Sequence, residues 1–134
     1  MIVLLDSSAL IAYLKTEPGA SVVDSYLSNQ INVCAVHAIN LCEVYYELLR
    51  LTDQVRAKET ISRLLVAGLI VREDMDTEFW QEAGNYKATI KRVSLADCFC
   101  LALANRLGAE IITADRHEFG PLVEQKICKA RFIR

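Results

Sequence analysis

The first apolar run of the chain, Ile2-Val3-Leu4-Leu5, constrains the fold more than any other stretch. It shows no polar alternation, so both faces of the predicted strand should be covered, as in a parallel sheet sandwiched by helices. A polar turn begins at Asp6, and a helix is expected from Ser7 to about Lys15. Asp6 then lies just past the carboxyl end of the strand, where ligands bind in open α/β sheets. The alternative is that Asp6 only caps this helix.

Strands and helices alternate along the rest of the chain, which predicts a three-layer α/β/α sandwich with a parallel five-stranded sheet and right-handed crossovers. Further strands are expected at 31–36, 69–71, 111–113 and 131–133, and further helices at 20–27, at 38–51, from Asp53 to near Gly68, from Asp76 and at 95–107. No linker, repeat or low-complexity stretch is visible. We therefore expect a single domain over residues 1–134, with a sizeable core.

Composition narrows the class of protein. The hydrophobic fraction of 53% suggests that a partner covers some apolar surface. No apolar run is long enough to span a membrane and no signal peptide is visible, so the cytoplasm is the expected compartment. The net charge is -2, so a nucleic-acid binder of this composition needs a local basic rim or a bound cation. The cysteines are odd in number and lack zinc-ligand spacing, which predicts small buried thiols at Cys34, Cys42, Cys98, Cys100 and Cys128.

Four acids lie beside apolar elements rather than on solvated faces: Asp6, Glu43, Asp97 and Asp115. Carboxylates that lie close together repel one another and raise each other's pKa unless a cation or a donor compensates. Such a cluster makes sense as a site for Mg²⁺ or Mn²⁺. The bound ion would polarise a phosphodiester and lower the pKa of a bound water. No pair of His or Cys residues suggests zinc.

Each acid has a plainer interpretation. Asp97 follows Ser94 by three residues, which fits the Asp form of a capping box, and Asp115 fits a turn residue. Glu43 is harder to explain in this way, because its neighbours are apolar and acids are rarely buried unpaired.

Other polar residues flank the four acids. Hydroxyls or amides that could orient carboxylates or waters belong to Ser7, Ser8, Asn40 and Thr113, and caps and turns explain each equally well. Side chains that could form a basic rim for phosphates, or simply a solvated face, belong to Lys87, Lys91, Arg92 and Arg116. His37 and His117 are expected to be ordinary polar residues rather than metal ligands.

Together these pieces resemble a PIN-domain ribonuclease, in particular the VapC-type toxins of toxin–antitoxin modules. The matching segments span nearly the whole chain in the order of the family: Leu4-Leu5-Asp6-Ser7-Ser8-Ala9-Leu10, Asn40-Leu41-Cys42-Glu43-Val44-Tyr45-Tyr46, Ser94-Leu95-Ala96-Asp97, and Thr113-Ala114-Asp115 with Phe119 behind it. Each segment alone is weakly diagnostic, whereas the four at these separations are specific to the family.

The resemblance implies that Asp6, Glu43, Asp97 and Asp115 bind the metal, with Thr113 or Ser7 as a hydroxyl beside it. Glu118 falls where some members carry an extra acid. A homodimer, an RNA substrate and a cognate antitoxin are implied as well. The expected activity is metal-dependent hydrolysis of RNA by a toxin. The alternatives are a PIN-domain protein of RNA processing or decay without an antitoxin, and a non-catalytic RNA-binding module of the same fold.

Two other classes of protein place a Mg²⁺-binding acid after the first strand of a parallel sheet. Phosphatases of the haloacid-dehalogenase type need a second Asp where this chain has Ser8. Receiver domains need a paired acid near the first strand and a Lys at the end of a late strand, where Asp115 stands. Neither pattern is met. No Ser-His or Cys-His pair is suggested, so hydrolysis without a protein nucleophile is expected.

Overall fold

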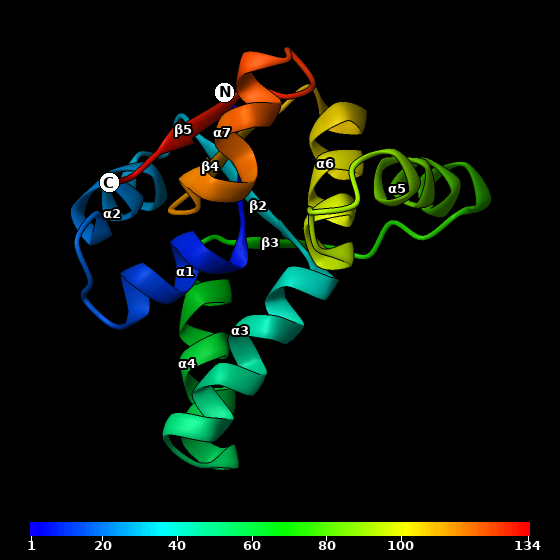
Figure 1. The fold of residues 1–134 in the computed structure, drawn as a ribbon. Coiled ribbons are helices and arrows are strands. Elements are labelled where there is room, and N and C mark those ends of the chain that lie inside the picture. Colours follow the sequence, from blue (N-terminus) through cyan, green and yellow to red (C-terminus); the bar gives the residue numbers. More distant parts are fainter.

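A computed structural model describes residues 1–134, and its centre is a five-stranded parallel sheet with strand order β3-β2-β1-β4-β5 (Figure 1). The strands are β1 (Ile2–Leu5), β2 (Val33–His37), β3 (Ile70–Arg72), β4 (Glu110–Thr113) and β5 (Ala130–Phe132). The helices are α1 (Ser7–Leu14), α2 (Ala20–Ser28), α3 (Ala38–Leu51), α4 (Gln54–Val66), α5 (Thr77–Thr89), α6 (Leu95–Leu107) and α7 (Arg116–Glu124). The predicted parallel α/β fold is confirmed. None of the helices is both long and apolar enough to cross a membrane.

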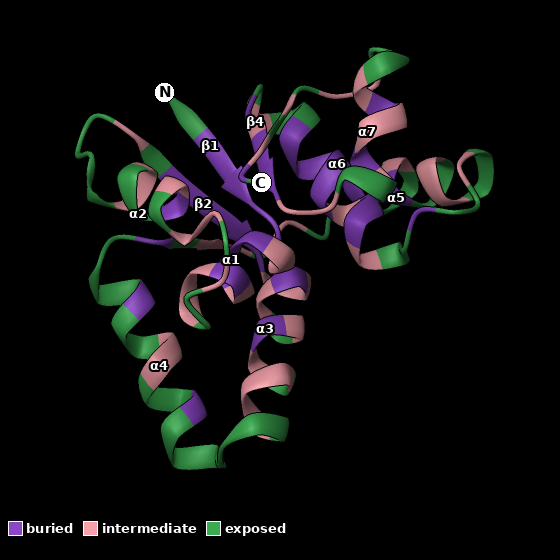
Figure 2. Ribbon diagram, turned by 60° about the vertical axis from the view of Figure 1, so that its left-hand side comes forward, coloured by how far each residue is buried: buried purple, intermediate pink, exposed green.

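Helices cover the sheet on both faces, which explains the apolar strands (Figure 2). Along β1, Val3 and Leu5 pack with the side chains of α1 to α4, whereas Leu4 packs with those of α5 to α7. All three side chains are fully buried. The missing polar alternation of this strand is therefore the direct signature of its central place in a sandwich.

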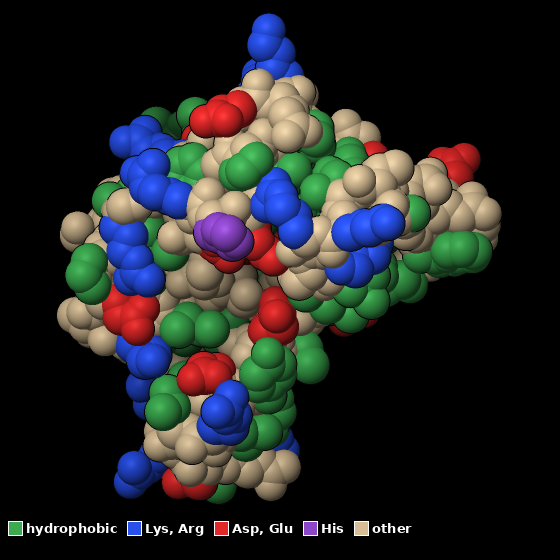
Figure 3. Space-filling view, viewed as in Figure 1, with side chains coloured by type: hydrophobic (Ala, Val, Ile, Leu, Met, Phe, Trp, Pro, Cys, Tyr) green, Lys and Arg blue, Asp and Glu red, His purple; other side chains and the backbone are tan.

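The α3–α4 pair extends away from the sheet as an arm, visible at the bottom of Figures 1 and 3. Val44 and Leu64 lie on the inner side of this arm and belong to the core shared with α1 and α2. Further out the arm is thinly packed: Leu51 and Val55, near its tip, have exposed fractions of 55% and 66%.

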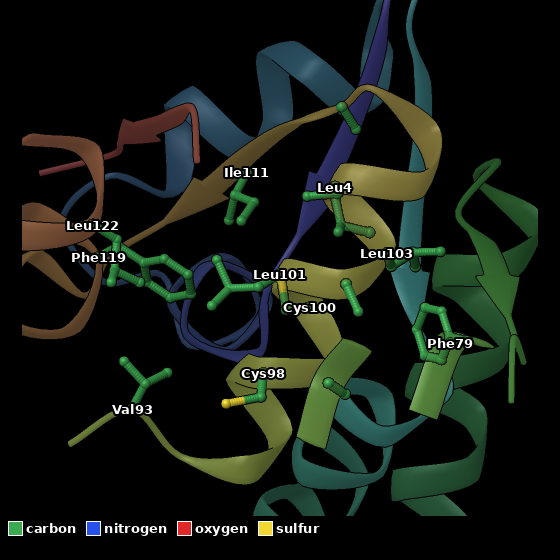
Figure 4. Close-up of a cluster of buried hydrophobic side chains, with 14 of the residues drawn as sticks. Leu4, Phe79, Val93, Cys98, Cys100, Leu101, Leu103, Ile111, Phe119 and Leu122 are labelled. Carbon is green, nitrogen blue, oxygen red and sulfur yellow. The ribbon is translucent and has the colours of Figure 1, made fainter. Parts of the chain in front are cut away.

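Phe119 and Leu122 of α7 close the core on the face covered by α6 (Figure 4). α7 was not predicted from the sequence, because Gly120 and Pro121 in its middle are typical of a break. β2 begins at Val33, two residues later than expected, and leaves Ile31 78% exposed.

The prediction that all five cysteines are buried was wrong. All of them are free thiols, and Cys34, Cys98 and Cys100 are buried, but Cys128 is only half-buried and Cys42 is exposed. Cys42 lies on α3, whose outer face points away from the core, so its apolar neighbours in sequence do not cover it.

Candidate functional site

The four predicted acids lie on elements that meet at the carboxyl ends of β1 and β4. Asp6 follows β1 and Asp115 follows β4, while Asp97 lies in the first turn of α6 and Glu43 in the second turn of α3. The chain leaves β1 towards β2 on one side, and β4 flanks β1 on the other, so this is a topological switch point of the sheet. In Figure 3 acidic side chains gather near the centre of the visible face, around this end of the sheet.

Asp6 both caps α1 and contacts the loop after β4, because its two carboxylate oxygens have different hydrogen-bond partners. Asp6 Oδ1 accepts hydrogen bonds from the backbone N–H of Ala9 (2.9 Å) and from Ser8 Oγ (2.8 Å). Asp6 Oδ2 accepts a hydrogen bond of 2.5 Å from Thr113 Oγ1. The carboxylate is buried and held in one orientation. The two interpretations of Asp6 in the sequence are therefore compatible.

Two hydroxyls join the loop after β1 to the loop after β4. Ser8 Oγ accepts the backbone N–H of Ala114 (2.9 Å) and lies 3.2 Å from Thr113 Oγ1. Thr113 Oγ1 in turn accepts the backbone N–H of Asp115 (2.9 Å). Ser7, named with Thr113 as the alternative hydroxyl, makes no side-chain hydrogen bond, so Ser8 and Thr113 are the pair that reaches Asp6.

The carboxylate of Glu118, rather than that of Asp97, accepts the backbone N–H of Ser94 at the start of α6. Ser94 Oγ accepts the backbone N–H of Asp97 (3.2 Å), which is the first half of a capping box. The second half would send the Asp97 carboxylate back to the N–H of Ser94, but that N–H donates to Glu118 Oε1 instead (3.1 Å). The carboxylate of Asp97 is buried at the site and is not used as a cap.

Asp97, Asp115 and Glu118 bring carboxylate oxygens within 4.8 Å of one another. Asp115 also caps α7, since its Oδ1 accepts the backbone N–H of Glu118 (2.9 Å). Each of these acids lies in or just before the first turn of a helix, where the macrodipole favours negative charge.

Glu43 lies outside this group of three and is tied to it through Asn40. Asn40 Nδ2 donates to Glu43 Oε1 and to the backbone carbonyl of Ala96, both at 3.4 Å, and so links α3 to the residue before Asp97. Asn40 is fully buried, and its Oδ1 has no hydrogen-bond partner. Unpaired buried acceptors are rare, and this one lies beside the acids.

His37 caps the same helix. Its Nδ1 accepts the backbone N–H of Ile39 (3.1 Å), and its Nε2 lies 3.0 Å from the carbonyl of Asp74. The imidazole stacks on the rings of Phe79 and Phe99. Both ring nitrogens are therefore engaged within the fold.

The electrostatics of the site fit a divalent cation. Burial, which outweighs three hydrogen bonds to the carboxylate, raises the pKa of Asp6 to about 6. Burial also raises the pKa of Asp97 strongly, and the neighbouring carboxylates of Glu118, Asp6 and Glu43 add to the effect. Oxygen donors that repel one another in this way are the ligand set of a hard cation such as Mg²⁺ or Mn²⁺.

The four predicted phosphate-binding cations are largely engaged within the protein. Lys87 Nζ donates to the carbonyls of Lys91 and Val93 (2.9 and 2.8 Å) at the end of α5. Arg92 Nη1 donates to two carbonyls of α7, and Arg116 Nε donates to the main-chain oxygen of Arg134. Lys91 alone is exposed without such a contact.

Glu118 is the one residue of the site that reasoning from the residues missed and only the resemblance indicated. A local signal was present, because Asp115 and Glu118 stand at the spacing of a capping box, which also marks the start of α7. Its contact with Ser94, 24 residues away, carries no sequence signal.

Comparison with known proteins places the fold. The sequence model of the PIN domain family matches residues 3–120, and no curated protein matches the chain. VapBC-1 from nontypeable Haemophilus influenzae is similar in structure, with 20% identity, a TM-score of 0.73 and coverage of 99% of this chain and 98% of its own. DNA-bound VapBC from Salmonella typhimurium has 16% identity, a TM-score of 0.75 and 100% coverage of both chains. VapC20 from Mycobacterium tuberculosis, a sarcin–ricin loop cleaving toxin, has 14% identity, a TM-score of 0.70 and coverage of 90% and 95%.

Proposed function

Because this chain belongs to the PIN domain family, we propose that it is a metal-dependent endoribonuclease and the toxin of a toxin–antitoxin system. The observation that carries the proposal is the convergence of Asp97, Asp115 and Glu118, with Asp6 and Glu43 around them. Every one of the four predicted acids is present at the carboxyl end of the sheet, which argues against a non-catalytic module.

In this proposal Asp97, Asp115 and Glu118 would hold Mg²⁺ or Mn²⁺, with Asp6 and Glu43 contributing charge. The ion, when bound, would polarise the scissile phosphodiester and lower the pKa of the attacking water. The protein's own part is to fix the carboxylates: Ser8 and Thr113 hold Asp6, and Asn40 holds Glu43. Both nitrogens of His37 are engaged in hydrogen bonds, so this residue is not free to activate a Ser or Cys side chain, and the nucleophile that we propose is water.

The test is cleavage of labelled RNA with Mg²⁺ or Mn²⁺ and with EDTA. Asp97→Asn removes a charge at nearly constant shape, so cleavage should fall by at least ~10²-fold while the circular dichroism spectrum stays unchanged. The control is Asp53→Asn, since Asp53 caps α4 (2.9 Å to the N–H of Arg56) outside the site, and Asn also caps helices. Cleavage that survives EDTA, or an Asp97→Asn protein as active as the control, would overturn the proposal.

The partners we propose are an RNA substrate, a cognate antitoxin and a second copy of the chain. The solved structures of similar fold support the antitoxin, because one of them, with 16% identity and a TM-score of 0.73, is a toxin–antitoxin complex from Klebsiella pneumoniae. An antitoxin that covers the acids and places an Arg side chain against them would satisfy the uncompensated charge. The free thiols fit the reducing conditions of the cytoplasm, where we propose that the protein acts.

A further inference from the structure

We propose that a cluster of three cations beside the acids, formed by Lys15, Arg116 and Arg134, binds the phosphates of the RNA strand next to the cleaved bond. We call it the basic cluster; the inference rests on the proposed nuclease function and adds the path of the substrate. In Figure 3 Lys and Arg side chains gather on the left of the visible face, over α1, α2 and β5, and the acidic side chains lie nearer the centre.

The basic cluster is continuous with the site. Arg116 directly follows Asp115, and its guanidinium lies 4.7 Å from the centre of the Phe132 ring. Its Nε donates to the main-chain oxygen of Arg134 at 2.7 Å, which joins the start of α7 to the segment after β5. Its two Nη groups have no protein partner and are free for the paired oxygens of a phosphate.

Arg134 is held in place before any ligand arrives. Its Nη1 donates to Glu17 Oε1 (3.3 Å) and to the carbonyl of Pro18 (3.1 Å). The segment that carries it rests against Gly19, which has a φ of 96° and where an added Cβ would lie 2.7 Å from the carbonyl oxygen of Ile133. Such ordering lowers the entropy cost of binding.

The charge balance of the basic cluster favours a polyanion. Lys15 Nζ lies 3.5 Å from Glu17, which is also the partner of Arg134, so one acid is shared by two of the three cations. All three cations are exposed. The chain as a whole has a net charge of -2, so this excess of positive charge is local, and Arg116 places it next to Asp115.

The experiment measures binding of a short labelled single-stranded RNA to the Asp97→Asn protein in Mg²⁺, over about 50 to about 200 mM salt. Adding Lys15→Gln and Arg134→Gln together should raise Kd about tenfold at the lowest salt and flatten the plot of log Kd against log salt by about 1.4, or about 0.7 for each lost phosphate contact. The matched control is Lys58→Gln with Arg63→Gln on α4, which removes the same charges from exposed positions on the arm.

Equal Kd values and slopes for the two double variants would overturn the inference and would leave the basic cluster as a surface for a protein partner. That outcome is separate from failure of the proposed function. If the parent protein cleaves RNA only with metal and the basic cluster does not affect binding, the substrate path is refuted and the nuclease function is not. A parent that cleaves no RNA refutes the nuclease, and the binding data still decide whether the basic cluster contacts RNA.

Discussion

At the scale of single residues, the buried carboxylate of Asp6 lowers the free energy of unfolding when no metal is bound. Burial raises the pKa of Asp6 from its ordinary value of 3.8 to about 6, so between these values the folded state binds protons more readily than the unfolded state. The destabilisation is about 3 kcal/mol when both states are ionised, above the folded pKa, and it fades as the pH falls from about 6 to about 4.

The Asp6→Asn protein should therefore melt at a higher temperature than the parent protein in EDTA at about pH 7.5. The difference between the two melting temperatures should be smaller at about pH 5. Mg²⁺ should stabilise the parent by about 2.7 kcal/mol at a hundredfold excess over Kd, and the variant by clearly less. Thermal melts with and without metal at the two pH values check this. If the variant were the less stable protein in EDTA and Mg²⁺ did not move the parent, Asp6 would be a helix cap only.

At the scale of elements, α7 is completed by a residue from outside it. Pro121 has no N–H, so the carbonyl of His117, four residues earlier, lacks its usual donor in the helix. Arg92 Nη1 supplies the missing donor, with contacts of 3.2 Å to this carbonyl and 3.0 Å to that of Glu118. A side chain predicted from sequence to bind phosphate thus stabilises the helix whose first turn carries Glu118.

The effects of Arg92→Ala and Pro121→Ala on stability should not add. Arg92→Ala should cost about 1 kcal/mol in the parent and less in the Pro121→Ala protein, where the new N–H reaches His117. Urea denaturation of the two single variants and the double variant measures the coupling. Arg63→Ala, an exposed residue in a 3.8 Å ion pair on α4, is the reference and should change stability little. Additive effects would mean that Arg92 does not replace the lost hydrogen bond.

The same helix marks how far sequence reasoning reaches. A buried parallel strand appears in the sequence as an uninterrupted apolar run, and an acid that directly follows such a run can be recognised from the sequence alone. β1 and Asp6 were therefore predictable. The hydrogen bond from the N–H of Ser94 to the side chain of Glu118 joins distant segments of the chain, and so does the hydrogen bond from Arg92 to the carbonyl of Glu118. Neither contact could be predicted from the sequence. The charge of a Lys or Arg residue does not show whether its side chain hydrogen-bonds within the protein or remains available for a phosphate.

At the scale of the whole molecule, large apolar side chains remain uncovered on α3, α5 and the start of α6. Tyr46, Trp80 and Leu95 have exposed fractions of 47%, 48% and 54%, and Figure 3 shows hydrophobic side chains along α3 and below α5. We expect this surface to pair two copies of the chain, because exposed apolar area of this kind marks interfaces.

Light scattering at micromolar concentration should give the mass of a dimer, and Trp80→Lys should shift it towards the monomer. The control is Val66→Lys, since Val66 is 88% exposed at the last residue of α4, where the arm returns to the sheet. A parent protein that is monomeric, or a Trp80→Lys protein that dimerises as well as the control, would refute this interface.

The hydrogen bond between Asp6 and Thr113 joins residues 107 positions apart, which has a consequence for the order of events in a cell. At about 5–20 residues per second, a ribosome needs roughly 5–20 s to proceed from one to the other. During that interval β1 has no β4 to pair with, and the loops that carry Asp6 and Asp115 cannot meet. The nascent chain therefore holds no assembled acid site until the segment that carries Thr113 and Asp115 has been synthesised.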